Sequence, residues 1–180
     1  MTAKECIVER RSIRQFKDLP ISHDLLAEII ETASFAPSWK NSQITRYVVV
    51  EGNLKNQIAS ACTEGHPRNG EIITQAPALV VITFIKGRSG FERDGSYTTQ
   101  KGDSWQMFDA GIATQTFCLA AHEQGIGSVI MGIFDDAKVA SILDLPDTQE
   151  VAALVPIGYP DEIPVAPKRK TVEDLLSIKS

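Results

Sequence analysis

The chain has 180 residues, of which 43% are hydrophobic and 23% charged. These proportions are typical of a globular protein with one core, and they exclude a largely disordered chain. The formal net charge of −5 argues against a nucleic-acid-binding protein. The polar N-terminus, three cysteines without a CxxC pair and apolar runs too short to cross a membrane predict a cytoplasmic protein.

The first half of the chain predicts three helices and a strand. Thr2 and Glu5 are spaced as a capping box at the start of the first helix, and Ser22 is placed to cap the second. In chain order, the predicted elements are a helix over 2–11, a helix over 23–33, a strand over 47–51, a helix over 54–63 and a loop over 64–71.

The second half begins with the apolar run LVVITFI at 79–85, which predicts a central strand because both of its faces are apolar. A polar, glycine-containing stretch follows at 86–104, and long irregular segments of this kind are usually functional or mobile. The remaining predicted elements are a helix over 105–124, a strand over 128–134, a short helix capped by Asp135 or Asp136 and ending near 143, a strand over 151–157 and a helix over 171–178. Mixed helices and strands without repeats or a linker predict one domain over 1–180, of the α/β or α+β class.

Several common site motifs are absent from the sequence. It has no P-loop and no GxSxG motif, and its three histidines are too scattered to indicate metal ligands. Gly125-Ile126-Gly127 follows a predicted helix and precedes a strand, the reverse of a dinucleotide-binding loop, so it indicates a helix end and a turn. The sequence therefore predicts no metal site and no catalytic triad or dyad.

Basic residues gather near both ends of this acidic chain. Arg10, Arg11 and Arg14, with the hydroxyl of Ser12, can surround a phosphate, because guanidinium groups make bidentate contacts and stay charged. Near the other end, Lys168-Arg169-Lys170 follows a proline-rich stretch that stiffens its approach. The alternative for either cluster is an ordinary solvated basic surface.

A polar loop, Ala36-Pro37-Ser38-Trp39-Lys40-Asn41-Ser42-Gln43, lies directly before the first predicted strand. Its serine, asparagine and glutamine side chains offer donors and acceptors that suit the edge of a planar polar ring. The alternative is an ordinary helix-to-strand connection with turn-forming residues.

Together, the two basic clusters, this loop, Gly125-Ile126-Gly127-Ser128 and Ile157-Gly158-Tyr159-Pro160 resemble the nitroreductase family of FMN-dependent oxidoreductases. The resemblance implies an α+β fold with a mixed, mainly antiparallel central sheet wrapped by helices. It also implies an interlocked homodimer with two FMN sites at the subunit interface.

The resemblance further implies a role for each matching residue. Those expected to hold the FMN phosphate and ribityl chain are Arg10, Arg11, Ser12, Lys168 and Arg169, and Arg14 is expected to approach the N1/C2 edge of the ring and stabilise the reduced flavin. The loop residues expected to cover the ring from the partner subunit are Pro37, Ser38, Trp39, Asn41 and Gln43. Backbone groups near Ile130, Met131 and Gly132 are expected beside flavin N5 and O4.

The implied activity is ping-pong hydride transfer through flavin N5, from NADH or NADPH to an electron-poor acceptor such as a nitroaromatic or a quinone. The alternatives are a flavin-binding or redox-sensing protein with little turnover, a different reaction on the same scaffold (enone reduction, dehalogenation or flavin destruction) and a protein without flavin. Two features depart from the family pattern. Ile44-Thr45 stands where a proline and an aromatic residue usually follow the loop. The 86–104 segment matches no family motif, and the resemblance implies that this variable region shapes the substrate pocket.

Overall fold

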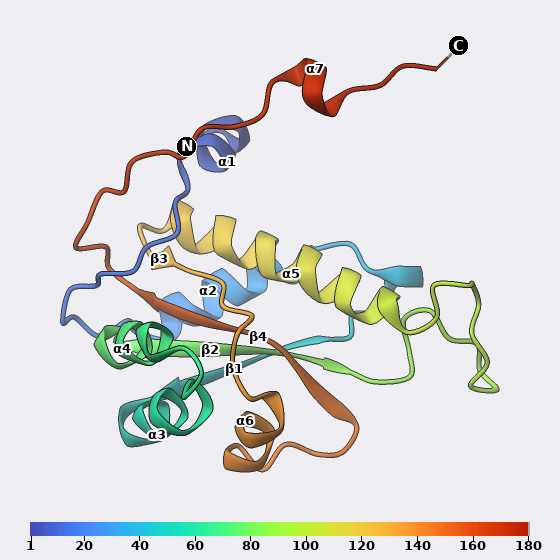
Figure 1. Cartoon of the computed structure of the whole chain (residues 1–180), viewed down its shortest axis with the longest axis horizontal. Coiled ribbons are helices and arrows are strands. Elements are labelled where there is room, and N and C mark those ends of the chain that lie inside the picture. The colour runs from blue at the N-terminus through green and yellow to red at the C-terminus, as the bar shows by residue number, and fades with distance from the viewer. Residues whose placement is uncertain (180) are drawn as a thin grey trace.

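Four antiparallel strands form the centre of the fold in the order β1-β2-β4-β3, with helices on both faces (Figure 1). The computed structural model describes residues 1–179. The elements in chain order are α1 (Ala3–Glu9), α2 (His23–Ala33), the 3-10 turn η1 (Trp39–Asn41), β1 (Thr45–Glu51), α3 (Gly52–Cys62), α4 (Pro67–Gln75), β2 (Ala78–Ile85), α5 (Ser104–Glu123), β3 (Gly127–Ser128), α6 (Asp136–Ile142), β4 (Gln149–Gly158) and α7 (Val172–Leu175).

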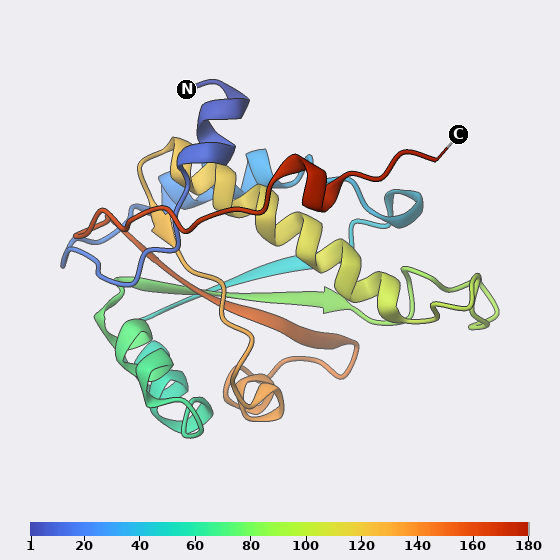
Figure 2. The ribbon, with the colours of Figure 1, turned by 45° about the horizontal axis from the view of Figure 1, so that its top comes forward.

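Strand β2 divides the interior into two cores, as its apolar sequence predicts. Leu79 and Val81 face one core and Val80 and Ile82 face the other, and all four side chains are fully buried. The first core lies between the sheet and α3, α4 and α6, and the second between the sheet and α2 and α5. Figure 2 shows these two helical layers on opposite sides of the strands. The α+β class and the central position of this strand are confirmed.

Three helices, α1, α2 and α6, begin at predicted capping residues. The Thr2 hydroxyl accepts from the Glu5 N–H and the Glu5 carboxylate accepts from the Thr2 N–H, which completes the capping box of α1. Ser22 caps α2 and Asp135 caps α6 by the same kind of side-chain bond. Helix α7 is shorter than predicted. In residues 1–179 no helix combines the length and apolarity that crossing a bilayer requires.

The predicted loop over 64–71 is wrong, because helix α4 begins inside it at Pro67. Proline suits the first turn of a helix, where its missing N–H has no partner to lose. Gly70, within this helix, serves helix packing. A Cβ on Gly70 would lie 2.6 Å from Thr63 Oγ1 and 2.7 Å from the Ala59 carbonyl oxygen, so α3 and α4 can approach only with glycine there.

The predicted strand over 128–134 is also wrong in its extent. Strand β3 covers only Gly127–Ser128, and further pairing with β4 returns only at Met131, opposite Leu154. Pro156 of β4 stands in between, opposite Val129, and proline has no N–H to donate to a neighbouring strand. The Val129 N–H reaches the Pro156 oxygen at 3.4 Å, which is a long bond for a β-ladder.

Candidate functional site

Arginines from both ends of the sequence line one pocket of about 450 Å³. We call it the basic pocket, and its lining residues are Arg10, Arg11, Ser12, Arg14, Pro164, Val165, Pro167 and Arg169. The structure therefore brings together the two basic clusters that the sequence singled out. Lys168, which was predicted to join them, does not line this pocket.

The N-terminal wall of the basic pocket is fixed by pairing with the edge of the sheet. Ser12 forms a parallel bridge to Ser128, and the Ile13 N–H donates to the Ser128 oxygen at 3.0 Å. Gly127 makes this approach possible, since a Cβ there would lie 2.7 Å from a carbon of the Ile13 side chain. The arginines are therefore presented by a segment whose backbone is held in place.

Glu162 attaches the C-terminal wall to the N-terminal one. Its carboxylate accepts the backbone N–H groups of both Arg14 and Gln15, the latter at 3.2 Å. The Asp161 N–H donates to the Gln15 oxygen at 3.0 Å. We call residues 161–179 the C-terminal arm. These bonds direct the start of that arm across the arginine segment, which places Arg169 at the pocket.

The basic pocket holds positive charge that its own chain leaves uncompensated. No acidic residue lines it, and the salt bridges found within residues 1–179 do not involve any of its four arginines. Arg10 Nε is buried without a hydrogen-bond partner in this part of the chain, which is unusual for a charged donor. Burial, and secondly the nearby Arg10 charge, lower the pKa of His122 below its ordinary value. This donor set fits a phosphate.

The loop over residues 37–43, here called the 37–43 loop, has a strained backbone. Lys40, Asn41 and Gln43 adopt φ values of 45°, 54° and 48°, in the left-handed region that side chains other than glycine rarely occupy. The Ser38 hydroxyl accepts from the Gln43 N–H at 2.9 Å and closes the loop on itself. The Trp39 ring packs against Trp105, with ring centroids 4.7 Å apart.

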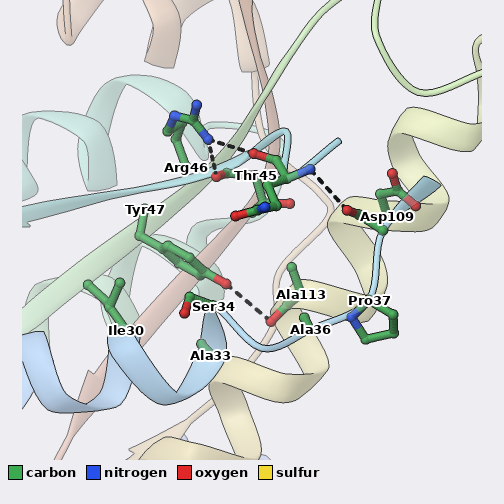
Figure 3. A pocket seen from close by; sticks show the side chains of 12 residues that line it. Ile30, Ala33, Ser34, Ala36, Pro37, Thr45, Arg46, Tyr47, Asp109 and Ala113 are labelled. Carbon is green, nitrogen blue, oxygen red and sulfur yellow. Dashed lines mark hydrogen bonds between the residues drawn. The ribbon is translucent and has the colours of Figure 1, made fainter. Parts of the chain in front are cut away.

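A second pocket, of about 360 Å³, lies beside this loop (Figure 3). Pro37, Ser38 and Gln43 line it from the loop, with side chains of α2, β1 and α5. The Tyr47 hydroxyl points to the Ala113 oxygen at 3.5 Å, and burial raises the pKa of Tyr47 to about 12. Arg46 Nη1 donates to the Gln43 and Thr45 oxygens, both at 2.8 Å, and so holds the end of the loop to β1.

The unusual Ile44-Thr45 pair does not project from the loop as an obstruction. Ile44 is 1% exposed and packs with Phe84 and Ala110 in a small core cluster. Thr45 is the first residue of β1 and lines the second pocket. The departure from the family pattern therefore anchors the loop in the interior of its own chain.

The segment around Met131 presents alternate residues outward. Met131 is buried, and both its N–H and its carbonyl are bonded to Leu154, at 2.8 and 3.1 Å. Ile130 and Gly132 are exposed, and their backbone groups make no backbone hydrogen bond within residues 1–179. Of the three residues predicted here, Ile130 and Gly132 have backbone groups available to a ligand and Met131 does not.

The basic pocket and the 37–43 loop lie toward opposite ends of α5 (Figure 1). Trp39 is bonded to Asp109 in the second turn of α5, whereas Ser12 pairs with Ser128, just beyond the end of the helix. A helix of 20 residues is about 30 Å long at about 1.5 Å a residue. A single chain therefore does not bring the two predicted parts of the site together.

Three residues at these sites were missed in the sequence: Asp109, Ser89 and Glu162. Asp109 carried a signal in the sequence, because it lies among apolar residues on the buried face of a helical pattern. A carboxylate is costly to bury there unless it has hydrogen-bond partners, so its presence indicates a role. Ser89 and Glu162 belong to irregular segments and carried no comparable signal.

Comparisons with known proteins agree on one family. The model of the nitroreductase family matches residues 7–71 and 65–159. The protein of Bacillus subtilis named putative NAD(P)H nitroreductase YfhC is 27% identical over 186 residues, covering 95% of this chain and 91% of that protein. The iodotyrosine deiodinase of Thermotoga neapolitana is 26% identical over 161 residues, covering 86% of each.

Among solved structures, a nitroreductase-type protein from Desulfovibrio desulfuricans in complex with FMN is 26% identical, with a TM-score of 0.79. The match covers 98% of this chain and 96% of that one. Since the family model extends over most of the sequence, and the arginine segment and the polar loop lie inside the matched residues, the chain belongs to the nitroreductase family.

Proposed function

We propose that this protein is an FMN-dependent oxidoreductase, one domain over residues 1–180, that uses NADH or NADPH to reduce electron-poor acceptors such as nitroaromatics or quinones. The observation that carries the proposal is the basic pocket, where arginines from both ends of the chain converge without a compensating acid. When bound, FMN supplies hydride acceptance and donation at N5. Its binding by the Desulfovibrio desulfuricans relative supports the assignment.

Arg10, Arg11, Arg169 and the Ser12 hydroxyl are assigned to the FMN phosphate and ribityl chain. The unpartnered, buried Nε of Arg10 is a donor for which a phosphate oxygen is the natural acceptor. Lys168 does not line the pocket, so its part is limited to long-range attraction of the phosphate.

Arg14 is assigned to the N1/C2 edge of the ring. Its Nη1 donates to the Ser12 oxygen at 3.3 Å, and its backbone N–H is held by Glu162, so the side chain starts from a fixed position. A fixed guanidinium stabilises negative charge that develops near it. No side chain has to donate or remove a proton at this edge.

The site is proposed to be completed by a second copy of the chain. Along α5, the 37–43 loop and the basic pocket are separated by about 20–30 Å, at about 1.5 Å a residue. The five-carbon ribityl chain, at about 1.5 Å a bond, spans less than half of that distance. The near edge of the ring of a flavin whose phosphate lies in the basic pocket therefore stays well short of this loop. We infer that a second copy supplies Pro37, Ser38, Trp39, Asn41 and Gln43 to cover the ring.

Unpartnered apolar surface supports a dimer. On the C-terminal arm, Ile163 and Val165 are 98% and 93% exposed, and Leu175 and Ile178 also face solvent. The outer side of α5 carries the exposed Phe108 and Met107. A monomer rarely leaves so much large apolar side-chain area in water, and a second copy seated on α5 would cover it.

Reductive dehalogenation is a second candidate activity. The similarity to iodotyrosine deiodinase of Thermotoga neapolitana extends over 86% of this chain. This dehalogenation would use the same flavin site, with a halogenated aromatic compound as the acceptor. Product analysis with a nitroaromatic, a quinone and a halogenated phenol separates the two activities, and the absence of turnover on all three would favour a flavin-binding or redox-sensing protein.

The direct test is to titrate the purified protein with FMN while measuring its molecular mass by sedimentation. The proposal expects one FMN per chain, a dimer, and bleaching of the flavin by NADH or NADPH that a nitroaromatic or a quinone reverses. A protein that binds no flavin, or a flavin that neither nucleotide reduces, contradicts the proposal.

A further inference from the structure

A buried carboxylate on α5 connects two segments that are far apart in the sequence. Asp109 is 2% exposed. Its two carboxylate oxygens lie 3.1 and 3.0 Å from the backbone nitrogen of Trp39 and accept its N–H. The fully buried Ser89 donates its hydroxyl proton to Asp109 Oδ2. Within residues 1–179, no cationic side chain pairs with this carboxylate.

The direction of the hydroxyl bonds follows from counting protons. Ser42 Oγ and Ser89 Oγ are 2.7 Å apart, and each hydroxyl has one proton to donate. Because Ser89 gives its proton to Asp109, Ser42 donates to Ser89. A relay from Ser42 through Ser89, a longer direct contact from Ser42 Oγ to Asp109 Oδ2 at 3.4 Å and the bond from the Trp39 backbone N–H therefore converge on the carboxylate. They supply the hydrogen bonds that a buried carboxylate requires.

Other contacts between the same segments are weaker or lie at the surface. Lys40 Nζ is 3.4 Å from Glu92 Oε1, in an exposed pair that contributes little. Trp39 packs on Trp105 with the ring planes tilted by 46°. The Asp109 carboxylate is thus the buried link between the 37–43 loop and the segment 86–104.

The loop needs such an anchor because its backbone is strained. Three of its residues have positive φ, and conformations of this kind persist only where surrounding contacts hold them. Asp109 holds the loop on both sides of the strained residues Lys40 and Asn41, at the Trp39 backbone N–H and at the Ser42 hydroxyl, the latter both directly and through Ser89.

We propose that Asp109 is a positioning residue for acceptor binding. It fixes the 37–43 loop and, through Ser89, the 86–104 segment in the arrangement in which they complete the ring side of the partner copy's flavin site. This inference rests on the proposed function, because only there does the loop cover a flavin. Asp109 itself touches neither flavin nor acceptor.

The test compares Asp109→Ala with Asp109→Asn and with a control, Thr114→Val, in the FMN-loaded protein. Thr114 is buried on the same helix, and its hydroxyl donates to the Ala110 oxygen rather than to any loop residue within residues 1–179. The readouts are the coupled circular-dichroism signal of the Trp39–Trp105 pair, amide hydrogen exchange over 37–43 and 86–92, and separate KM and kcat values for a nitroaromatic. Trp39→Phe identifies the coupled signal.

Asp109→Ala is expected to lose the coupled signal, to speed amide exchange in both segments, and to raise KM about tenfold or more, the loss expected for one charge-assisted hydrogen bond. FMN content and kcat should change less than KM. Asp109→Asn keeps one oxygen for the Trp39 N–H and should recover most of the signal. Thr114→Val should change none of the three readouts.

The inference is overturned if Asp109→Ala keeps the wild-type circular-dichroism signal, amide exchange and KM. It is also overturned if Thr114→Val changes these readouts as much as Asp109→Ala does. If Asp109→Ala does not fold, Ser89→Ala decides. It removes the bond from the 86–104 segment to Asp109 while Trp39 and Ser42 keep theirs. Exchange should therefore become faster over 86–92 while the Trp39 amide stays protected, and unchanged exchange over 86–92 overturns the inference. Failure of the proposed function is seen separately, as a wild-type protein that binds no FMN.

Discussion

Removing Arg10 and Arg169 together tests whether the two ends of the chain hold one phosphate. Both line the basic pocket, and neither has an acidic partner within residues 1–179. A hydrogen bond to a charged group contributes about 1.5–3 kcal/mol, and the exposed Arg169 belongs at the lower end because solvent screens it. The double variant Arg10→Ala/Arg169→Ala should lose about 3–5 kcal/mol of FMN binding, or about 10²–10⁴-fold in Kd.

Quenching of flavin fluorescence during titration of the apoprotein measures this Kd. Riboflavin, which lacks the phosphate, should lose far less affinity, so the ratio of the two losses isolates the phosphate contact. Lys4→Ala/Arg68→Ala removes the same total charge outside the basic pocket and should leave FMN binding nearly unchanged. A double variant that binds FMN within about threefold of wild type, a difference below about 1 kcal/mol, would refute the reasoning.

Three further predictions concern the same region. Arg14→Ala should retain FMN but lower its reduction potential by on the order of 30–60 mV, and potentiometry that finds no shift would exclude the assigned role. Gly127→Ala should cost about 1–3 kcal/mol of unfolding free energy and weaken FMN binding by displacing Ile13, whereas Gly65→Ala, whose Cβ would meet nothing, should leave FMN binding intact. Because burial and Arg10 hold the pKa of His122 below 6.5, the unfolded chain binds the extra proton, so stability should fall as the pH drops below about 6.5. In denaturant unfolding across that range, His122→Gln should flatten this dependence, and an unchanged slope would contradict it.

The sequence predicts well wherever a single local rule decides the structure. The capping residues Thr2, Ser22 and Asp135 mark helix starts because their hydrogen bonds close within three residues. The apolar run of β2 marks a central strand because both of its faces must be covered.

The two wrong predictions share a cause, since in each a distant segment overrides the local pattern. The close approach of α4 to α3 at Gly70 appears only once both helices are in place. Val129 and Ile130 have the composition of a strand, but the neighbour opposite them includes Pro156, which cannot donate a hydrogen bond. Neither contact can be inferred from a window of adjacent residues.

Some residues of the candidate site could be predicted from the sequence, and others are identified only by the fold. The arginine clusters stand out as charge in an acidic chain, and their meeting in one pocket agrees with the resemblance. Asp109 and Ser89 form no motif, because their relation exists only after the 86–104 segment folds against α5. That the 37–43 loop lies toward the other end of α5 from the basic pocket also follows only from the fold.

Mixing two defective variants tests the central claim, that each flavin site is built from two copies. One variant carries Arg10→Ala/Arg169→Ala and the other Trp39→Ala/Asn41→Ala, and each alone should have little turnover. If sites are shared, every mixed dimer contains one intact site, and co-refolding equal amounts should restore about a quarter of wild-type turnover. If each chain builds its own site, the mixture would show only the average of its two parents, and that result would contradict the account.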